Sequence, residues 1–151
     1  MQMEERAKQM IRTGKASCVI AKGGEIVRSA AGKGIAPLLS FYEREPEVLK
    51  GADVFDRVVG KAAAMIIILG GAGKAYGKIM SAPAAAYLVR NGCAAEYERQ
   101  IDFIRNRAGD GLCPLERAVL SMEDPKTGYL LLKETAARLA EAVRKKPARV
   151  L

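Results

Sequence analysis

The sequence predicts one layered α/β domain, with a mixed sheet of four or five strands and helices on both faces. Three observations lead to this fold class. Short runs rich in β-branched residues alternate along the chain with longer runs of helix-forming residues. Glycine pairs and proline positions separate these runs. The chain has 151 residues, which is enough for one domain and too few for two ordinary ones.

The first third of the chain is expected to form a helix, a hairpin and a second helix. Residues Met3–Arg12 carry helix formers with apolar residues at helical spacing, which predicts a short amphipathic helix. The runs SCVIAK and EIVRSA flank the pair Gly23-Gly24, a pattern typical of a β-hairpin. Pro37 suits a first helical turn, and the run LLSFYERE continues that helix until Pro46.

The most apolar run of the chain, 62–69, is compatible with two structures. Its three alanines favour a helix, whereas Ile66, Ile67 and Ile68 alone would suit a strand. We predict a helix over residues 56–69, with Asp53 or Asp56 as its N-cap. The glycines that follow end the element in either case.

Two strands and another helix are expected next. A strand covers residues 75–80, and a helix then starts at Ser81-Ala82-Pro83, where a capping residue precedes a first-turn proline. That helix ends at Asn91-Gly92, a common signal at the C-terminus of a helix. A second strand follows over residues 95–100.

The C-terminal part is expected to be helical after a loop around residues 106–111. A short helix begins near Cys113-Pro114, and a long last helix covers roughly residues 126–146. We therefore assign residues 1–123 to the α/β domain and residues 124–151 to a C-terminal helix and basic tail that pack on the same domain.

Composition excludes several kinds of site. The chain has no histidine, which excludes a histidine metal site, a Ser-His-Asp triad and an imidazole proton shuttle. Its three cysteines, Cys18, Cys93 and Cys113, have no metal-ligand spacing, so zinc would need all three thiols and a carboxylate. We expect no metal and no cofactor, and we expect Cys18 to be a buried thiol in a strand.

The net charge of +8 lies at the two ends of the chain. Residues 1–35 carry +4, residues 36–125 carry −1 and residues 126–151 carry +5. Basic ends attract anionic partners, so weak contact with nucleic acid through the termini is one interpretation. A solvated surface with a basic tail is the favoured one. The chain has neither a run of ~20 apolar residues nor the apolar region of a signal peptide, so we expect a cytoplasmic protein without a membrane partner.

The string GGAGKAYGK could be a dinucleotide-binding turn if the preceding MIIIL were a strand. Gly71, Gly73 and Gly77 would then supply the glycines, and Glu96 would lie at the right distance downstream. Pro83 would interrupt the helix that such a turn requires. The alanines before MIIIL also favour a helix, so we favour a plain turn between a helix and a strand.

The strings VVGKAAA and SAPAAAY give a helix, a strand and a second helix that opens with a proline, a layout that resembles the cytidine deaminase superfamily. In that superfamily H-x-E opens the first helix and P-C-x-x-C opens the second. Here Gly60-Lys61-Ala62-Ala63 stands at the first motif, and Ala84 and Tyr87 take the cysteine places after Pro83. The resemblance implies a three-layer deaminase-like fold without zinc-dependent deamination, in which two helix N-termini face one cleft that suits an anion or a carbonyl oxygen.

The chain is more closely similar to an uncharacterised prokaryotic family of unknown function with a cytidine deaminase-like fold. The similarity covers about residues 15–123. VVGKAA and GLCPxE are its most specific strings; the others are the Gly23-Gly24 hairpin, Gly34-Ile35-x-Pro37-Leu38-Leu39, Ser81-x-Pro83-Ala84 and Asn106-Arg107. It implies a fold and a cleft, but no established activity.

Three hypotheses for function follow. In the first, a small anionic or nucleotide-like ligand binds between the helix starts at Lys61 and Pro83. The residues expected to line that cleft are Asp56, Gly60, Lys61, Ser81, Pro83, Asn106 and Arg107. In the second, Cys113 at a helix start is a nucleophile, with Glu116 as acid/base and Lys61 as its charge partner. In the third, the basic ends bind RNA or another protein. Cys113 and Glu116 could also simply cap their helix, and Lys61 could extend to the surface. We expect a homodimer.

Overall fold

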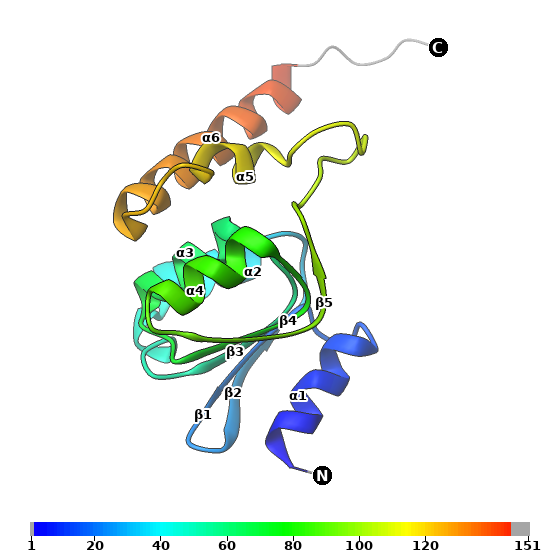
Figure 1. Cartoon of the computed structure of the whole chain (residues 1–151), viewed down its shortest axis with the longest axis vertical. Coiled ribbons are helices and arrows are strands. Elements are labelled where there is room, and N and C mark those ends of the chain that lie inside the picture. The colour runs from blue at the N-terminus through cyan, green and yellow to red at the C-terminus, as the bar shows by residue number, and fades with distance from the viewer. Residues whose placement is uncertain (1, 146–151) are drawn as a thin grey trace.

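The computed structural model describes residues 2–145 and shows a five-stranded mixed sheet in the order β2-β1-β3-β4-β5 (Figure 1). The strands are β1 (Cys18–Lys22), β2 (Glu25–Ala30), β3 (Asp53–Val59), β4 (Lys74–Ser81) and β5 (Ala94–Ile101). β1 is antiparallel to both β2 and β3, whereas β3, β4 and β5 are parallel to one another. The predicted α/β fold with a mixed sheet is confirmed.

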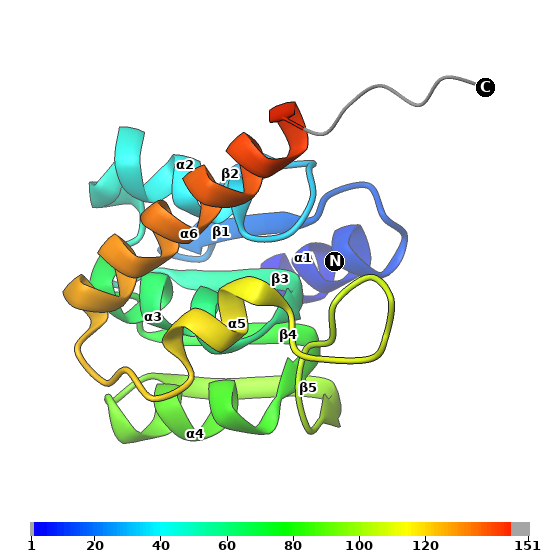
Figure 2. The ribbon, with the colours of Figure 1, turned by 90° about the horizontal axis from the view of Figure 1, so that it is seen from above.

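Helices cover both faces of this sheet, as the sequence predicts. They are α1 (Met3–Arg12), α2 (Ala36–Arg44), the short 3-10 helix η1 (Pro46–Val48), α3 (Lys61–Gly70), α4 (Ala82–Arg90), α5 (Pro114–Val119) and α6 (Pro125–Lys145). α1 lies on one face, and α2, α3 and α4 lie on the other (Figure 1). α5 and α6 pack outside α3, so α3 lies between the sheet and a further helical layer (Figure 2). No helix within residues 2–145 is long and apolar enough to cross a membrane.

The hairpin between β1 and β2 forms at the glycine pair that predicts it. Gly23 and Gly24 have φ angles of +58° and +81°, which are left-handed values that side chains rarely adopt. Two successive left-handed residues form the turn whose twist matches that of the flanking strands.

The helix predicted over residues 56–69 is wrong in its first half, because residues Asp53–Val59 form strand β3. This strand lies in the middle of the sheet, between β1 and β4. Val54 and Phe55 are therefore buried on opposite faces, in the two separate apolar clusters of the molecule. Gly60 is extended, with φ −96° and ψ 179°, and the helix begins only at Lys61.

The string MIIIL belongs to α3, so the dinucleotide-turn interpretation is wrong. Seven consecutive residues of this helix, from Lys61 to Ile67, are buried. Gly71 ends the helix with a left-handed φ of +82°. On the outer side Gly128 of α6 lies against Met65 so closely that a Cβ at Gly128 would come 2.5 Å from the Met65 Cε. The run is apolar all round because it is the central buried helix.

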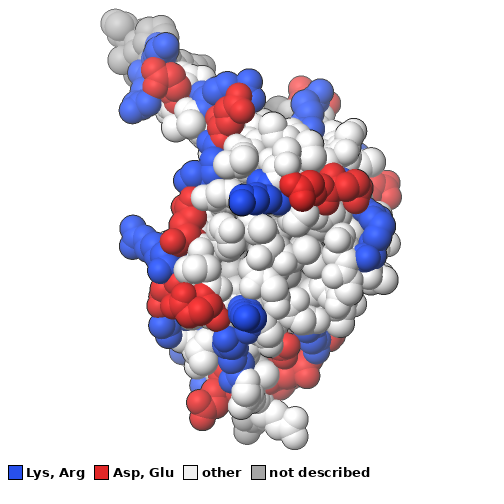
Figure 3. All heavy atoms as spheres, turned by 90° about the vertical axis from the view of Figure 1, so that its left-hand side faces the viewer, with Lys and Arg blue, Asp and Glu red and all other residues white. Residues whose placement is uncertain are grey.

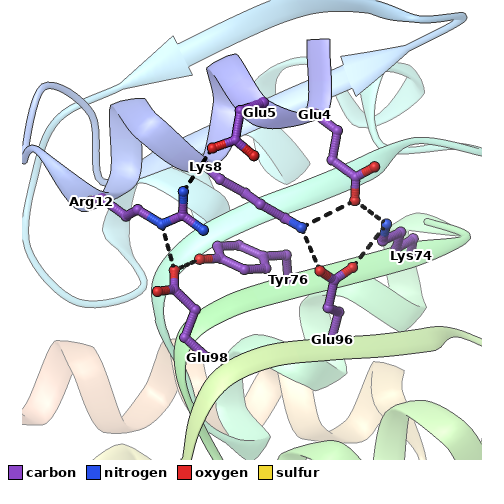
Figure 4. A network of polar contacts seen from close by, with 8 residues as sticks. All are labelled: Glu4, Glu5, Lys8, Arg12, Lys74, Tyr76, Glu96 and Glu98. Carbon is purple, nitrogen blue, oxygen red and sulfur yellow. Dashed lines mark hydrogen bonds and ion pairs between the residues drawn. The ribbon is translucent and has the colours of Figure 1, made fainter. Parts of the chain in front are cut away.

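Charged contacts fix α1 to the sheet (Figure 4). Lys74 of β4 lies 2.6 Å from Glu4 and 3.0 Å from Glu96, and Lys8 also pairs with Glu96. At the other end of α1, Arg12 lies 3.0 Å from Glu98 of β5 and 2.9 Å from Glu5; Glu98 also accepts a hydrogen bond from Tyr76. Lys8 and Arg12 of this helix are thus paired with carboxylates. Residues 146–151 of the predicted basic tail lie outside the described residues.

α3 and α4 end at one edge of the sheet and begin at the other. The edge where α3 and α4 end has few charges at its centre and more around its rim (Figure 3). The other edge is formed by the carboxyl ends of β3, β4 and β5, where α3 and α4 begin. Ligands of open α/β sheets bind at the carboxyl ends of the strands, so a functional site is expected at that edge.

Candidate functional site

A cavity of about 230 Å³ lies at the carboxyl end of β3. A water molecule occupies ~30 Å³ in the liquid, so the cavity is large enough for a small organic molecule. Four segments form its walls. They are the β1 and β3 region (Ser17, Asp56, Arg57, Val58), the loop after β2 (Gly32, Gly34, Ile35), the start of α3 (Gly60, Ala62) and the segment that ends in α5 (Ile104, Cys113, Leu115, Glu116). We call it the Asp56–Glu116 cavity.

Glu116 caps the N-terminus of α3 from another helix. Its Oε1 accepts a hydrogen bond from the Lys61 N–H at 2.7 Å, and its Oε2 accepts one from the Ala62 N–H at 3.0 Å. The first N–H groups of a helix have no partner within the helix and carry partial positive charge. Burial raises the pKa of Glu116, and the two N–H donors act in the opposite direction. The chain therefore supplies its own carboxylate at the place where the sequence predicts an external anion.

Gly60 makes this cap sterically feasible. A Cβ at Gly60 would come 2.5–2.7 Å from the carboxylate atoms of Glu116, closer than real contacts allow. Its backbone angles are ordinary, so space rather than φ demands glycine here. Gly60 lines the cavity as expected, and it also permits α5 to dock against α3.

Asp56 is the second carboxyl group of the cavity. It is buried, with 6% of its surface exposed. Burial raises the pKa of Asp56 to about 7; the N–H groups of Arg57 and Val58 and the thiol of Cys18 limit the rise. Asp56 therefore exchanges its proton near neutral pH. The neighbouring Cys18 is buried, and burial and the Asp56 charge raise the pKa of its thiol well above the ordinary range.

The Lys61 side chain leaves the cavity, although its backbone N–H contacts Glu116. Its Nζ donates a hydrogen bond to the Leu120 carbonyl at 2.8 Å and lies 3.7 Å from a Glu123 carboxylate oxygen. The ammonium also lies 5.6 Å from the centre of the Tyr87 ring. Lys61 thus ties α3 to the turn after α5, and it is not placed to hold an anion or to accompany a Cys113 thiolate.

The start of α4 does not line the cavity. Ser81 is buried, and its Oγ accepts a hydrogen bond from the Ala84 N–H at 3.2 Å, so it caps α4 as expected. Pro83 lies in the first turn of the same helix. α3 and α4 begin at the same sheet edge, but the cavity lies on the α5 side of α3, away from α4. The expected cleft between the two helix starts is thus replaced by a cavity beside one of them.

Asn106 and Arg107 lie in the loop after β5 and do not line the cavity either. The Asn106 Oδ1 accepts hydrogen bonds from the N–H groups of Gly109 and Asp110, and its Nδ2 donates to Asp110. Asn106 therefore holds the loop in shape. Arg107 is exposed on the same loop.

Cys113 lines the cavity and is half-buried, whereas Cys18 and Cys93 are buried. It is the N-cap residue of α5, but its side chain makes no capping hydrogen bond. Burial raises the pKa of Cys93 to about 11. Within residues 2–145, no three His, Cys, Asp or Glu side chains come together in a way that could hold a metal ion.

Most cavity residues were not predicted, among them Ser17, Arg57, Ile104 and Leu115. Ser17 and Arg57 were missed because residues 56–59 were assigned to a helix, which hid strand β3 and its pairing with the predicted strand β1. The run DVFDRVV is rich in β-branched residues, and this was the available signal for a strand. Ile104 and Leu115 lie far from β3 in sequence, and no local pattern links them to it.

Comparison with solved structures shows the following similarities. A DUF1893 family protein (TM1506) from Thermotoga maritima has a TM-score of 0.76 and 24% identity, and the match covers 90% of this chain and 89% of that one. dCMP deaminase from the cyanophage S-TIM5 has a TM-score of 0.46 and 14% identity over 62% of this chain and 97% of that chain. RibD from Acinetobacter baumannii has a TM-score of 0.45 and 14% identity over 62% of this chain and 34% of that chain.

The family comparison agrees with the resemblance found in the sequence, which is to a family of unknown function. No curated protein matches the chain. The model of the TM1506 family, described as a domain of unknown function (DUF1893), matches residues 6–136, which include the first half of α6. The chain therefore belongs to the DUF1893 family.

Proposed function

We propose that the protein binds a small planar nitrogen heterocycle, of the nucleobase or nucleoside kind, in the Asp56–Glu116 cavity. The observation that carries this proposal is the pair of buried carboxyl groups, Asp56 and Glu116, on the wall of one cavity. Carboxyl groups whose pKa is raised by burial, in a cleft large enough for a ligand, are typical of binding and catalytic sites.

The chemistry of Asp56 favours a ligand with adjacent hydrogen-bond donors and acceptors. With a pKa of about 7, Asp56 is present in both protonation states near neutral pH. The protonated acid donates one hydrogen bond and accepts another, and the carboxylate only accepts. An edge with one donor and one acceptor, as in an amide or amidine, matches the protonated acid, and an edge with two adjacent N–H donors matches the carboxylate. The other wall residues include Ile35, Val58 and Leu115, which suit the faces of a flat ring.

The position of Glu116 argues against an anion as the part of the ligand that enters the cavity. Both of its oxygens already accept N–H groups at the start of α3, so this carboxylate occupies the position an external anion would take. A second anion beside Glu116 would meet like charge. Arg57, which is exposed and also lines the cavity, could instead meet an anionic group at the entrance.

Titration calorimetry with cytidine and uridine tests this function. We expect at least one of them to bind, and we expect Asp56→Asn to weaken its affinity at least ~10-fold, or about 1.4 kcal/mol. Asp53→Asn, on the same strand but outside the cavity, is the matched control and should retain the wild-type affinity. Equal affinity in wild type and Asp56→Asn would contradict the proposal.

A second candidate function rests on Cys113, the cysteine that lines the cavity. In this alternative the Cys113 thiol adds to an electrophilic ring carbon of the ligand. A carbon–sulfur bond forms as the π bond between that carbon and the neighbouring ring nitrogen breaks; the thiol proton passes to the Asp56 carboxylate, and Asp56 returns it to this nitrogen. The step is a reversible addition and needs no oxidant or reductant.

Labelling kinetics distinguish this alternative from simple binding. We expect iodoacetamide to modify Cys113 before Cys18 or Cys93, because the other two thiols are buried. If Cys113 is a nucleophile, Cys113→Ser should abolish the carbon–sulfur adduct while leaving the affinity for cytidine or uridine within about twofold. If it is not, Cys113→Ser should change neither.

Binding of RNA or protein through the basic ends has less support. Lys8 and Arg12 of α1, which belong to the N-terminal excess of charge, are engaged with Glu96 and Glu98 of the sheet. An external anion would have to compete with these carboxylates.

A further inference from the structure

A second hollow lies where β5 ends, outside the Asp56–Glu116 cavity. It measures about 540 Å³ and is lined by Arg99, Gln100, Ile101, Asp102, Phe103 and Arg105. None of these six residues lines the other cavity, so the two sites are distinct. We call it the Arg99–Arg105 hollow.

The two arginines of this hollow make no ion pair with any carboxylate in the described part of the chain. Asp102 lines the same hollow, yet it too lies beyond ion-pair distance of both. Some arginines of the molecule are paired, namely Arg12 with Glu98, Arg28 with Glu45 and Arg90 with Glu123, whereas others, such as the exposed Arg138, make no ion pair within the described residues. Two guanidinium groups on one concave wall therefore have unused hydrogen-bond donors, which suit an oxyanion such as phosphate.

An exposed aromatic ring accompanies these charges. Phe103 has 42% of its surface exposed and also lines the hollow. Bases stack on exposed aromatic rings in proteins that bind nucleotides or single strands, and each stacked base contributes ~1–3 kcal/mol. A ring beside two arginines thus matches a ligand that carries both a base and a phosphate.

Pairing and hydrogen bonds order the backbone that carries Arg99 and Arg105. Arg99 belongs to β5, and Arg105 forms an isolated antiparallel bridge with Leu112. The Cys113 N–H donates to the Ile104 carbonyl at 3.0 Å, and the Asn106 N–H donates to the Gly111 carbonyl at 2.8 Å, so the loop is closed on both sides of Arg105. The backbone that carries these residues is thus ordered before a ligand binds, which lowers the entropy lost on binding.

We propose that the Arg99–Arg105 hollow binds a nucleotidyl phosphate, with the phosphate between Arg99 and Arg105 and the base against Phe103. A base joined to a phosphate through a sugar occurs both in a free mononucleotide and in a single-stranded RNA. This proposal goes beyond the one for the Asp56–Glu116 cavity and does not depend on it.

Nuclear magnetic resonance titration with uridine monophosphate and with a short oligouridylate tests the proposal. We expect the amide signals of residues 99–105 to shift. The double variant Arg99→Gln/Arg105→Gln should weaken binding at least ~10-fold, because it removes both charged donors. Phe103→Leu should weaken it several-fold through lost stacking. Arg138→Gln, an exposed arginine on α6, is the matched control and should bind as the wild type does.

Salt dependence separates the two sources of the ligand. If the source is a single strand, the oligouridylate binds more tightly than the mononucleotide. Its log–log salt slope should then fall by roughly 0.7 in the double variant, because the two arginines neutralise one phosphate. If the source is a free nucleotide, the two ligands bind equally. Absence of shifts in residues 99–105 with both ligands, or an equal loss in Arg138→Gln, would overturn the proposal.

Discussion

Gly60 and Glu116 are coupled, although 56 positions separate them in the chain. The Glu116 carboxylate lies where a side chain at position 60 would begin, and from there it accepts the N–H groups of Lys61 and Ala62. Because Gly60 has no side chain, the Glu116 carboxylate of α5 can cap the N-terminus of α3.

This coupling predicts that Gly60→Ala destabilises the fold. The methyl group would overlap the Glu116 carboxylate, so either α5 moves or the cap is lost; we expect a loss of ~1–3 kcal/mol in the free energy of unfolding. Urea denaturation measures it. Gly73→Ala is the matched control, because nothing lies within 4 Å of a Cβ at Gly73. Equal stability of the two variants would mean that Gly60 is not required by the cap.

Glu116→Gln tests the cap from the other side. The amide keeps the shape of the side chain but replaces one acceptor oxygen by a donor, so one of the two N–H groups at the start of α3 loses its partner. We expect a loss of ~1–3 kcal/mol. In the double variant with Gly60→Ala the two losses should not add, because both act on the same contact. Full additivity would show that the two residues act independently.

Asp56 predicts a dependence of stability on pH with a definite sign. Its pKa is 3.8 in the unfolded chain and about 7 in the folded one, so folding favours the protonated acid. Its contribution to stability is present below pH ~4 and is lost progressively as the pH rises to ~7. A rise of about three pKa units on folding corresponds to a loss of up to ~4 kcal/mol in the free energy of unfolding over this pH range.

The variant Asp56→Asn should therefore flatten the stability curve between pH ~4 and ~7, relative to wild type. Urea denaturation at several pH values measures the difference. Asp53→Asn, on the same strand, is the control and should keep the wild-type slope. A slope in Asp56→Asn as steep as that of wild type would assign the effect to another group.

Lys61→Met should affect stability and leave ligand binding intact. The variant removes the hydrogen bond to the Leu120 carbonyl, which costs ~1–2 kcal/mol when the carbonyl stays unpaired. The affinity for cytidine or uridine should stay within about twofold, because the ammonium does not line the cavity. Lys126→Met, at an exposed lysine, is the control for stability. Loss of binding in a folded Lys61→Met would instead support the ligand-binding role that the sequence predicts for Lys61.

The ion pairs between α1 and the sheet predict a salt-sensitive contribution to stability. Glu96→Gln leaves both Lys8 and Lys74 without this carboxylate, and we expect a loss of ~0.5–1 kcal/mol at low salt. The loss should shrink at 1 M salt, where charges are screened within ~3 Å. Thermal unfolding at the two salt concentrations measures it, with Glu25→Gln in the hairpin as the control. A loss that does not depend on salt would indicate packing rather than charge.

Local sequence signals predicted most of the elements of the fold. Gly23-Gly24 marked the hairpin, Ser81 and Pro83 marked the start of α4, and Met3–Arg12 was predicted with its observed bounds. β3 was missed because alanines directly after it favour a helix, and only pairing with β1 and β4 decides the state of residues 53–59. Tertiary context overrode local propensity there.

The candidate site was predicted only in part. Asp56, Gly60, Cys113 and Glu116 do line one cavity. The sequence could not show that Glu116 reaches the start of α3, because that contact joins two segments through the docking of α5 and α6. It also could not show that the Lys61 side chain turns away towards Leu120. Both depend on packing between distant segments, for which the chain carries no local signal.

Native mass spectrometry of the purified protein tests the central claim most directly. If the Asp56–Glu116 cavity binds a nucleoside-like ligand, we expect the wild type and Asp53→Asn incubated with cytidine or uridine to carry its mass and to lose it on denaturation. Asp56→Asn should carry much less. An equal amount of bound ligand in Asp56→Asn, or no bound ligand in the wild type with either nucleoside, would contradict the assignment of the cavity.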